Sequence, residues 1–188
     1  MNDRKKMRHI NRNYSEPGHY CVTICTQDRE PWFGTIKNGI MTLNECGVIV
    51  DNQWRWLATN FDNVRIDEFC VMPDHFHGIL QILGDGHDVD RRDVVRHDVV
   101  RRDVGNGRDH SLRTCGHIEY TKKIKPLPEL IGAFKTTSSK KIHQSGATGF
   151  RWQKSFYDHV VRDGNDHARL RRYIAENALN WVKDEGNP

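Results

Sequence analysis

The sequence has no long hydrophobic run. Its apolar stretches span only a few residues, and the N-terminal segment MNDRKKMRHI lacks the apolar core of a signal peptide. We therefore predict a soluble, cytoplasmic protein with no membrane partner. Cysteine is also scarce: the five cysteines are an odd number, and Cys21 and Cys25 are too far apart for a CxxC redox or zinc pair. We interpret the cysteines as reduced and mostly buried.

A large excess of charge is absent too, although the charge is unevenly distributed. The net charge is +4 in 188 residues, a length that suits one domain with its own core. Seven arginines and seven aspartates offset one another in residues 84–117, so the basic excess lies in the first twelve residues and the C-terminal third. A basic surface of this kind is consistent with a polyanion such as nucleic acid, but solvated lysines are common on any protein.

A repeat with a period of five occupies residues 91–105, which read RRDVV, RHDVV and RRDVG. This period matches neither a helix nor a strand, so the segment has no persistent apolar face to bury. We predict a flexible insertion at about 84–117 with little part in chemistry. An arginine-rich arm for DNA is the alternative, but an aspartate follows the arginines in each repeat.

Outside the insertion, apolar periodicity predicts an α+β fold. Alternating residues predict strands at 18–27, 64–72, 75–83 and 155–163, and Asn38-Gly39 favours a tight hairpin turn between two short β-prone runs. Helical spacing predicts three helices: one capped by Asn44, one starting near Pro128, and a last one capped by Asp163 or Asn165 and running to about 184. We expect an antiparallel sheet of four or five strands with helices packed on it.

Two histidines on one predicted strand are the first candidate for chemistry. His75 and His77 are separated by one residue, so on an extended strand both side chains project from the same face. Neutral imidazole binds divalent cations readily. The pair predicts two ligands for one metal, although a chance pair on a solvated strand is the simpler interpretation in a chain with eleven histidines.

The context of this pair changes that balance. His75-Phe76-His77 follows Met72-Pro73-Asp74, and two further blocks follow downstream, from Trp152 to Arg162 and from Arg172 to Asn177. In this order the three blocks resemble the single-tyrosine HUH-type transposases, and within them the REP-associated tyrosine transposase group. The likeness spans most of residues 18–83 and 127–182. The chain departs from the family in having Ala178 where a proline usually follows the asparagine.

The resemblance implies a ferredoxin-like sheet with the histidine pair on a central strand. It also implies a DNA strand transferase and endonuclease in which Tyr173 is the nucleophile and His75, His77 and Asn177 hold Mg²⁺ or Mn²⁺. Tyr157 is the main competitor as nucleophile. Tyr173 and Asn177 are four residues apart, which places them on one face of a helix.

The implied substrate is single-stranded or hairpin DNA at REP-like repeats, which would associate the protein with the bacterial nucleoid. We expect the DNA phosphates to be contacted by basic residues of the C-terminal third, namely Lys135, Lys140, Lys141, Arg151, Arg162, Arg171 and Arg172. The sequence leaves open a monomer or a homodimer. Two rival functions also stay open: a DNA-binding relative without catalysis, and a metal-dependent phosphodiesterase that uses water as its nucleophile.

Overall fold

The computed structural model describes residue 14 and residues 16–84 and 125–184. The predicted insertion at about 84–117 lies outside the described residues except for Gly84. The elements are, in order, β1 (Gly18–Cys25), the short 3₁₀ turn η1 (Gln27–Arg29), β2 (Gly34–Lys37), β3 (Ile40–Leu43), α1 (Glu45–Asn60), β4 (Val64–Val71), β5 (His75–Ile82), α2 (Leu127–Gln144), β6 (Tyr157–Val160), α3 (Gly164–Ala175) and α4 (Asn177–Asp184).

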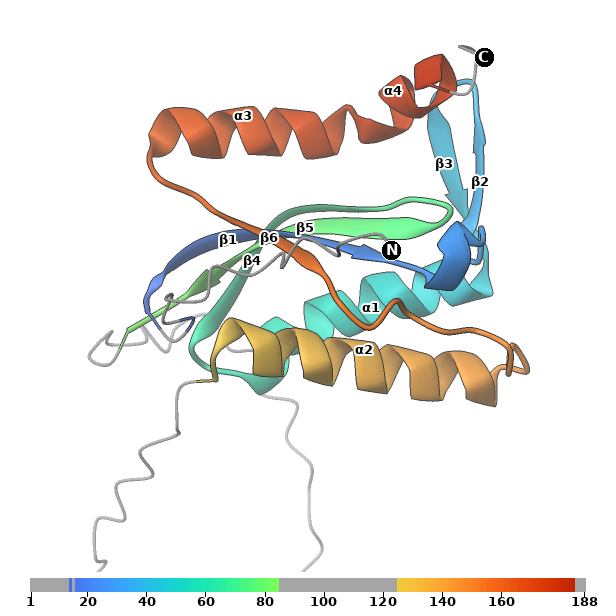
Figure 1. The fold of residues 1–188 in the computed structure, drawn as a ribbon, viewed down its shortest axis with the longest axis horizontal. Helices are drawn as coiled ribbons and strands as arrows, with labels where there is room; N and C mark the ends of the chain where they lie inside the picture. The colour runs from blue at the N-terminus through green and yellow to red at the C-terminus, as the bar shows by residue number, and fades with distance from the viewer. Residues whose placement is uncertain (1–13, 15, 85–124, 185–188) are drawn as a thin grey trace, which may run out of the picture. The chain divides into compact units, whose positions relative to one another are not determined.

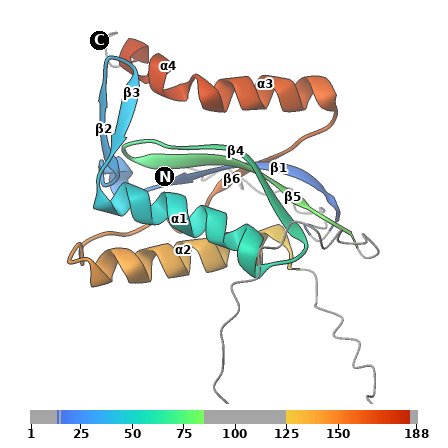
Figure 2. The same ribbon diagram turned by 180° about the vertical axis from the view of Figure 1, so that it is seen from behind.

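The main sheet has four strands in the order β4-β5-β1-β6, and every neighbouring pair is antiparallel. Along the chain its elements follow the order β1, α1, β4, β5, α2, β6, which is the ferredoxin-like arrangement. Helices α1 and α2 lie on one side of the sheet, and α3 and α4 lie on the other (Figures 1 and 2). The predicted α+β, ferredoxin-like fold is confirmed, with the histidine pair on the inner strand β5.

The main core lies between the sheet and helices α1 and α2. The alternation of β1 directs Tyr20, Val22 and Ile24 into this core, where each is at most 1% exposed. From α1, Trp54 packs on Phe76 of β5, with their ring centroids 4.6 Å apart. One face of the sheet is thus fully covered by apolar packing.

The opposite face of the sheet is covered as well. Cys21 of β1 and Ile79 of β5 form a second buried cluster with Leu170 and Ile174 of α3. The period-2 pattern of β1 predicts a strand with one solvated face, whereas both faces are packed because α3 lies over the second. Residues of β1 and β5 that share this face, including the two histidines, are therefore held under α3 and α4.

Local signals in the first half of the chain are confirmed. Asn38 and Gly39 form the turn between β2 and β3 with φ angles of 53° and 73°, which is the region that Asn and Gly tolerate. The side chain of Asn44 accepts a hydrogen bond from the Gly47 backbone N–H and caps α1. None of the described helices is long and apolar enough to cross a membrane.

The prediction of a single long C-terminal helix is wrong, because the structure has two helices there. Asp163 caps α3 as expected, by accepting from the backbone N–H groups of Asn165 and Asp166. However, α3 ends at Ala175, Glu176 is its C-cap with φ −90° and ψ 0°, and α4 begins at Asn177. The ψ of Glu176 departs from the regular helical value of about −42°, and beyond this residue α4 contacts the β2–β3 hairpin (Figure 1).

Candidate active site

A cavity of about 240 Å³ lies between the α3-facing side of the sheet and the C-terminal helices. Strands β1 and β5 supply its floor, and α3 and α4 supply one wall. Its lining residues are Thr23, Arg29, His75, His77, Tyr173, Asn177, Asn180 and Trp181. All four residues that we predict for catalysis and metal binding therefore meet in one place.

The two histidines lie side by side on β5, with ring centroids 4.6 Å apart, and both are nearly buried. Nδ1 of His75 donates to Oδ1 of Asp74 at 2.6 Å, and Nδ1 of His77 lies 2.8 Å from Oγ1 of Thr23. A histidine whose Nδ1 is hydrogen-bonded in this way presents Nε2 to a metal in a fixed orientation. Each ring of the pair therefore has a hydrogen-bond partner on Nδ1, as metal-ligating histidines usually have.

Burial keeps His77 neutral. The pKa of His77 is lowered to about 3, mainly by burial and to a smaller extent by the neighbouring His75 and Arg29, while Asp74 acts in the opposite direction. An imidazole with this pKa carries no proton on Nε2 throughout the physiological range when Nδ1 holds the hydrogen. His77 is therefore available as a ligand without first losing a proton.

Tyr173 and Asn177 reach the cavity from either side of the helix break. The Tyr173 ring lies 5.4 Å from the His77 ring, centroid to centroid, and 50% of the side chain is exposed. Asn177 is only 7% exposed, at the first residue of α4. The exposed phenol is open to a polymer substrate, whereas the amide is held in the interior of the site.

Tyr157, the competing nucleophile, also lies on this side of the sheet. It pairs with Thr23 across β6 and β1, and it is 47% exposed. However, it does not line the cavity that contains the histidines. The geometry therefore favours Tyr173, which contacts His77 directly.

A metal is implied by the resemblance, and the residues fit one. Two imidazoles with Nε2 available and one amide oxygen from Asn177 are donors that divalent cations accept, and three ligands leave positions open for water and phosphate. Within the described residues no group of three or more His, Cys, Asp or Glu side chains could hold a metal ion. The candidate set of metal ligands therefore needs the side-chain oxygen of Asn177 as its third member.

Three residues in or next to the cavity have no predicted role in the site from the sequence alone. Asp74 enters the sequence analysis only as the residue before the histidine pair, yet its carboxylate is 8% exposed and accepts from both His75 and Arg29, the latter at 2.9 Å. Thr23 has a signal in the sequence, because the alternation of β1 places it on the face opposite the core residues. Trp181, whose ring centroid lies 5.6 Å from that of His75, belongs to the last predicted helix, and its apolar spacing there indicates a core residue and not a site residue.

The basic residues that we predict for DNA contact do not form one surface. Arg171 and Arg172 lie on α3 and Arg162 lies just before it, on the cavity side of the sheet, and all three are exposed. Lys140 and Lys141 are exposed on α2, across the sheet, and Arg151 follows α2. The ammonium of Lys135 donates to the backbone carbonyls of residues 153–155.

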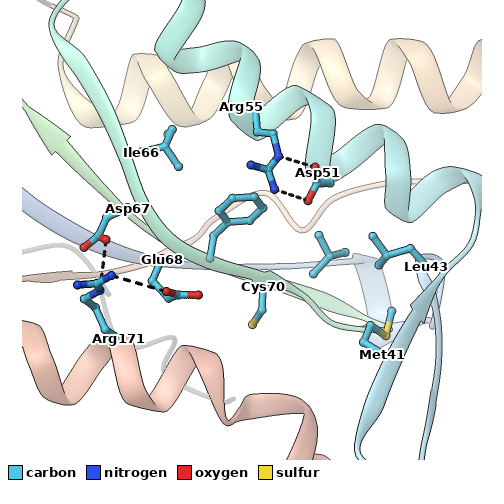
Figure 3. A pocket seen from close by; sticks show the side chains of 11 residues that line it. Met41, Leu43, Asp51, Arg55, Ile66, Asp67, Glu68, Cys70 and Arg171 are labelled. Atoms are coloured by element: carbon cyan, nitrogen blue, oxygen red, sulfur yellow. Dashed lines mark hydrogen bonds and ion pairs between the residues drawn. The ribbon is translucent and has the colours of Figure 1, made fainter. Parts of the chain in front are cut away.

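A second cavity, of about 540 Å³, lies beside the edge strand β4 (Figure 3). In it Arg171 pairs with Asp67 at 3.3 Å and with Glu68 at 3.9 Å, and Arg55 pairs with Asp51 at 2.8 Å. The charges in this cavity are thus largely matched within the protein. Arg171 is therefore less available to a phosphate than its exposure suggests.

Comparisons with known proteins support the fold. The chain is 28% identical over 185 residues to an uncharacterised protein of Haemophilus influenzae, an alignment that covers 98% of this chain and 93% of the relative. It is also similar to the solved structure of a REP-associated tyrosine transposase bound to a REP hairpin, with a TM-score of 0.54 and 16% identity over 93% of this chain and 74% of that one. The sequence matches no protein-family model. This chain and the REP-associated tyrosine transposase thus share a fold.

Proposed function

We propose that the protein is a single-tyrosine DNA strand transferase of the HUH transposase type, in which Tyr173 is the nucleophile. One observation carries this proposal: the exposed Tyr173 phenol and the two buried, oriented histidines line the same cavity. The resemblance of three sequence blocks and the fold shared with a REP-associated tyrosine transposase support the same conclusion.

In the proposed reaction, Oη of Tyr173 attacks the phosphorus of a DNA phosphodiester. The new bond joins Oη to phosphorus, and the bond from phosphorus to the 3′-oxygen breaks. The phenol proton passes to water or a carboxylate, and the departing 3′-oxygen takes up a proton. The products are a 5′-phosphotyrosine and a free 3′-hydroxyl, so a second 3′-hydroxyl can reverse the step without ATP.

Residues of the cavity divide this work. His75, His77 and Asn177 would hold Mg²⁺ or Mn²⁺, which when bound offsets the negative charge that develops on the phosphate. Asp74 and Thr23 fix the two imidazole rings from behind. The half-exposed Tyr173 can meet a strand that approaches from solvent, and its distance to His77 of the same chain supports attack in cis.

The proposed substrate is single-stranded DNA next to a hairpin, as the REP hairpin bound by the structurally similar transposase suggests. Arg162 and Arg172 stand on the cavity side of the sheet and could neutralise phosphates there. Lys140 and Lys141 lie across the sheet, so they could contact only DNA that extends around the domain.

The test is covalent capture. End-labelled single-stranded hairpins from the flanks of the gene are incubated with protein and Mg²⁺ or Mn²⁺ and then separated on a denaturing gel. We expect a protein-linked band for the native protein, none for Tyr173→Phe, and a retained band for Tyr157→Phe. The last variant is the matched control, because it also removes one exposed phenol hydroxyl.

The other outcomes separate the rival functions. Cleavage without a covalent band, unchanged by Tyr173→Phe, would identify a phosphodiesterase that uses water. Binding without cleavage in either metal would identify a DNA-binding relative without catalysis. A band that survives in Tyr173→Phe and disappears in Tyr157→Phe would reassign the nucleophile.

A further inference from the structure

Arg29 is a charged residue of the cavity to which neither the sequence pattern nor the resemblance gives a role. We propose that its guanidinium binds the DNA phosphate that Tyr173 attacks, which makes Arg29 a catalytic residue. This inference rests on the function proposed above, because it supplies a contact for the same phosphate.

The charge of the cavity supports this assignment. Of the described residues that line it, Arg29 alone carries a permanent charge; the others are Thr, Tyr, Asn, Trp and the two histidines. Asp74 lies behind His75 and does not line the cavity. A phosphodiester monoanion that enters would therefore meet one guanidinium, whose charge Asp74 offsets in part from behind, and no carboxylate in the lining.

The hydrogen bonds of Arg29 leave donors for a ligand. Its Nε donates to Oδ2 of Asp74 at 2.9 Å, and Nη1 donates to Sγ of Cys25 at 3.0 Å. A guanidinium has five N–H groups. Within the described part of the chain, both N–H groups of Nη2 and one of Nη1 thus have no partner, and the side chain is 50% exposed. Two N–H groups on neighbouring nitrogens match two phosphate oxygens.

The backbone holds Arg29 in an unusual conformation to reach this place. Asp28 and Arg29 have φ angles of 56° and 59°, in the left-handed region, which is unfavourable for residues other than glycine. Such conformations persist where surrounding contacts fix them, and they are concentrated at functional sites. An arginine that is only exposed to solvent does not need a backbone of this conformation.

Those surrounding contacts come from both sides of the turn. The backbone N–H and the hydroxyl of Thr26 both donate to the carbonyl of Asp74, at 2.9 Å and 2.8 Å. The backbone N–H of Gln27 donates to the carbonyl of Arg151 at 2.8 Å. The turn is thus fastened to the residue that precedes the histidine pair, so Arg29, Asp74 and His75 keep a fixed relation.

This fixed relation allows a different role, in which Arg29 acts only by positioning Asp74 and thereby His75. The two roles differ in what they require of the substrate. A phosphate contact depends on the negative charge of the attacked group, whereas positioning of Asp74 acts on metal affinity and is indifferent to that charge.

The experiment compares two strands, one with the ordinary phosphate at the cleaved position and one with an uncharged methylphosphonate there. Native protein, Arg29→Met and Arg29→Lys are measured on each strand for the single-turnover rate of the covalent band, and separately for Mn²⁺ affinity by calorimetry. Arg55→Met is the matched control, because Arg55 is likewise exposed and paired with a carboxylate but lies on α1, across the sheet.

On the phosphate strand we expect Arg29→Met to lower the rate about 10²–10³-fold, the range seen when one donor to a developing oxyanion is lost. Arg29→Lys should recover part of the rate. On the methylphosphonate strand the loss should shrink to less than about threefold, since no charge remains to be neutralised, and Mn²⁺ affinity should stay close to native.

An equal loss on both strands, with weakened Mn²⁺ binding, would overturn the proposal in favour of positioning, and so would native rates in Arg29→Met. If native protein forms no covalent band at all, the proposed function fails, and equilibrium binding then decides the role of Arg29. The proposal that Arg29 binds the phosphate then holds only if Arg29→Met weakens binding of the phosphate strand more than binding of the methylphosphonate strand.

Discussion

Thr23 and His77 are directly opposed on β1 and β5, and Oγ1 of Thr23 lies 2.8 Å from Nδ1 of His77. The hydroxyl oxygen can accept the Nδ1 hydrogen, which leaves the lone pair of Nε2 directed away from the strand. A strand pairing, rather than a loop, therefore fixes the orientation of a candidate metal ligand.

Replacing Thr23 with Val should weaken metal binding without unfolding the sheet. Valine keeps the branched shape that suits a strand but cannot accept the Nδ1 hydrogen. Loss of such a partner typically costs 10–100-fold in metal affinity, so we expect the Mn²⁺ dissociation constant to rise by about tenfold in calorimetry. Thr23→Ser, which keeps the hydroxyl, should bind Mn²⁺ almost as tightly as native protein. Equal affinity in the Val variant would show that the hydroxyl does not orient His77.

The lowered pKa of His77 predicts loss of stability in acid. Its folded pKa is about 3, below the unfolded value near 6.5, so the unfolded chain binds more protons between these values. The free energy of unfolding is therefore at its full value above pH 6.5 and falls as the pH drops from 6.5 toward 3. For this group alone, linkage gives a loss of about 1–2 kcal/mol by pH 5.

Urea unfolding of the metal-free protein at pH 7.5 and pH 5 measures this loss. In His77→Gln the difference between the two pH values should be smaller by about that amount, because glutamine does not titrate. An identical difference in both proteins would mean that the pKa of His77 is the same in the folded and unfolded states. Chelator in every sample prevents metal binding from adding to the apparent stability.

The fold was predictable because its signals are local and agree with one another. Alternation in β1, the Asn38-Gly39 turn and the Asn44 cap each specify one element, and each is present as expected. The break at Glu176 was not predictable, since apolar spacing continues from Leu170 to Trp181 as in one helix. In the structure α4 contacts the β2–β3 hairpin. That contact joins distant parts of the chain, so the local sequence pattern does not indicate it.

The site was predictable in part for the same reason. His75 and His77 share a strand face by their spacing alone, and Tyr173 and Asn177 came from the resemblance. Arg29 left no signal, because its place depends on two left-handed residues and on hydrogen bonds to distant parts of the chain. Sequence patterns specify which face a residue occupies in a regular element, but not where a loop directs its side chain.

Lys135 shows how a predicted DNA contact can be tested against a structural role. Its ammonium donates to the carbonyls of residues 153–155, which lead into β6. Hydrogen bonds from a charged group each contribute about 1.5–3 kcal/mol, so Lys135→Met should lower the free energy of unfolding by a similar amount. Its effect on hairpin affinity should be small. Lys140→Met is the matched control, because that side chain is exposed on the same helix and should leave stability unchanged. A loss of affinity with native stability in Lys135→Met would instead support the DNA contact.

The β2–β3 hairpin should control activity through α4. A Cβ atom on Gly39 would lie 2.7 Å from Cδ2 and 3.4 Å from Cα of Leu179, and the backbone there has a φ of 73°. Gly39→Ala should therefore cost about 1–2 kcal/mol of stability from the left-handed backbone and should also displace the Leu179 side chain of α4. Since α4 carries Asn177 and Trp181, we expect the covalent band to form more slowly as well.

Two further variants separate backbone strain from displacement of the Leu179 side chain. Gly39→Asn tolerates the positive φ but brings the same Cβ, so it should keep most of the stability while still slowing the covalent step. Adding Leu179→Ala to Gly39→Ala makes room for that Cβ, so the rate should recover although the strain remains. Gly132→Ala is the control for glycine replacement as such, because nothing lies within 4 Å of its Cβ position on α2; it should gain about 0.4–1 kcal/mol at an unchanged rate. If Gly39→Asn reacts at the native rate, the contact between the hairpin and Leu179 does not control the position of Asn177.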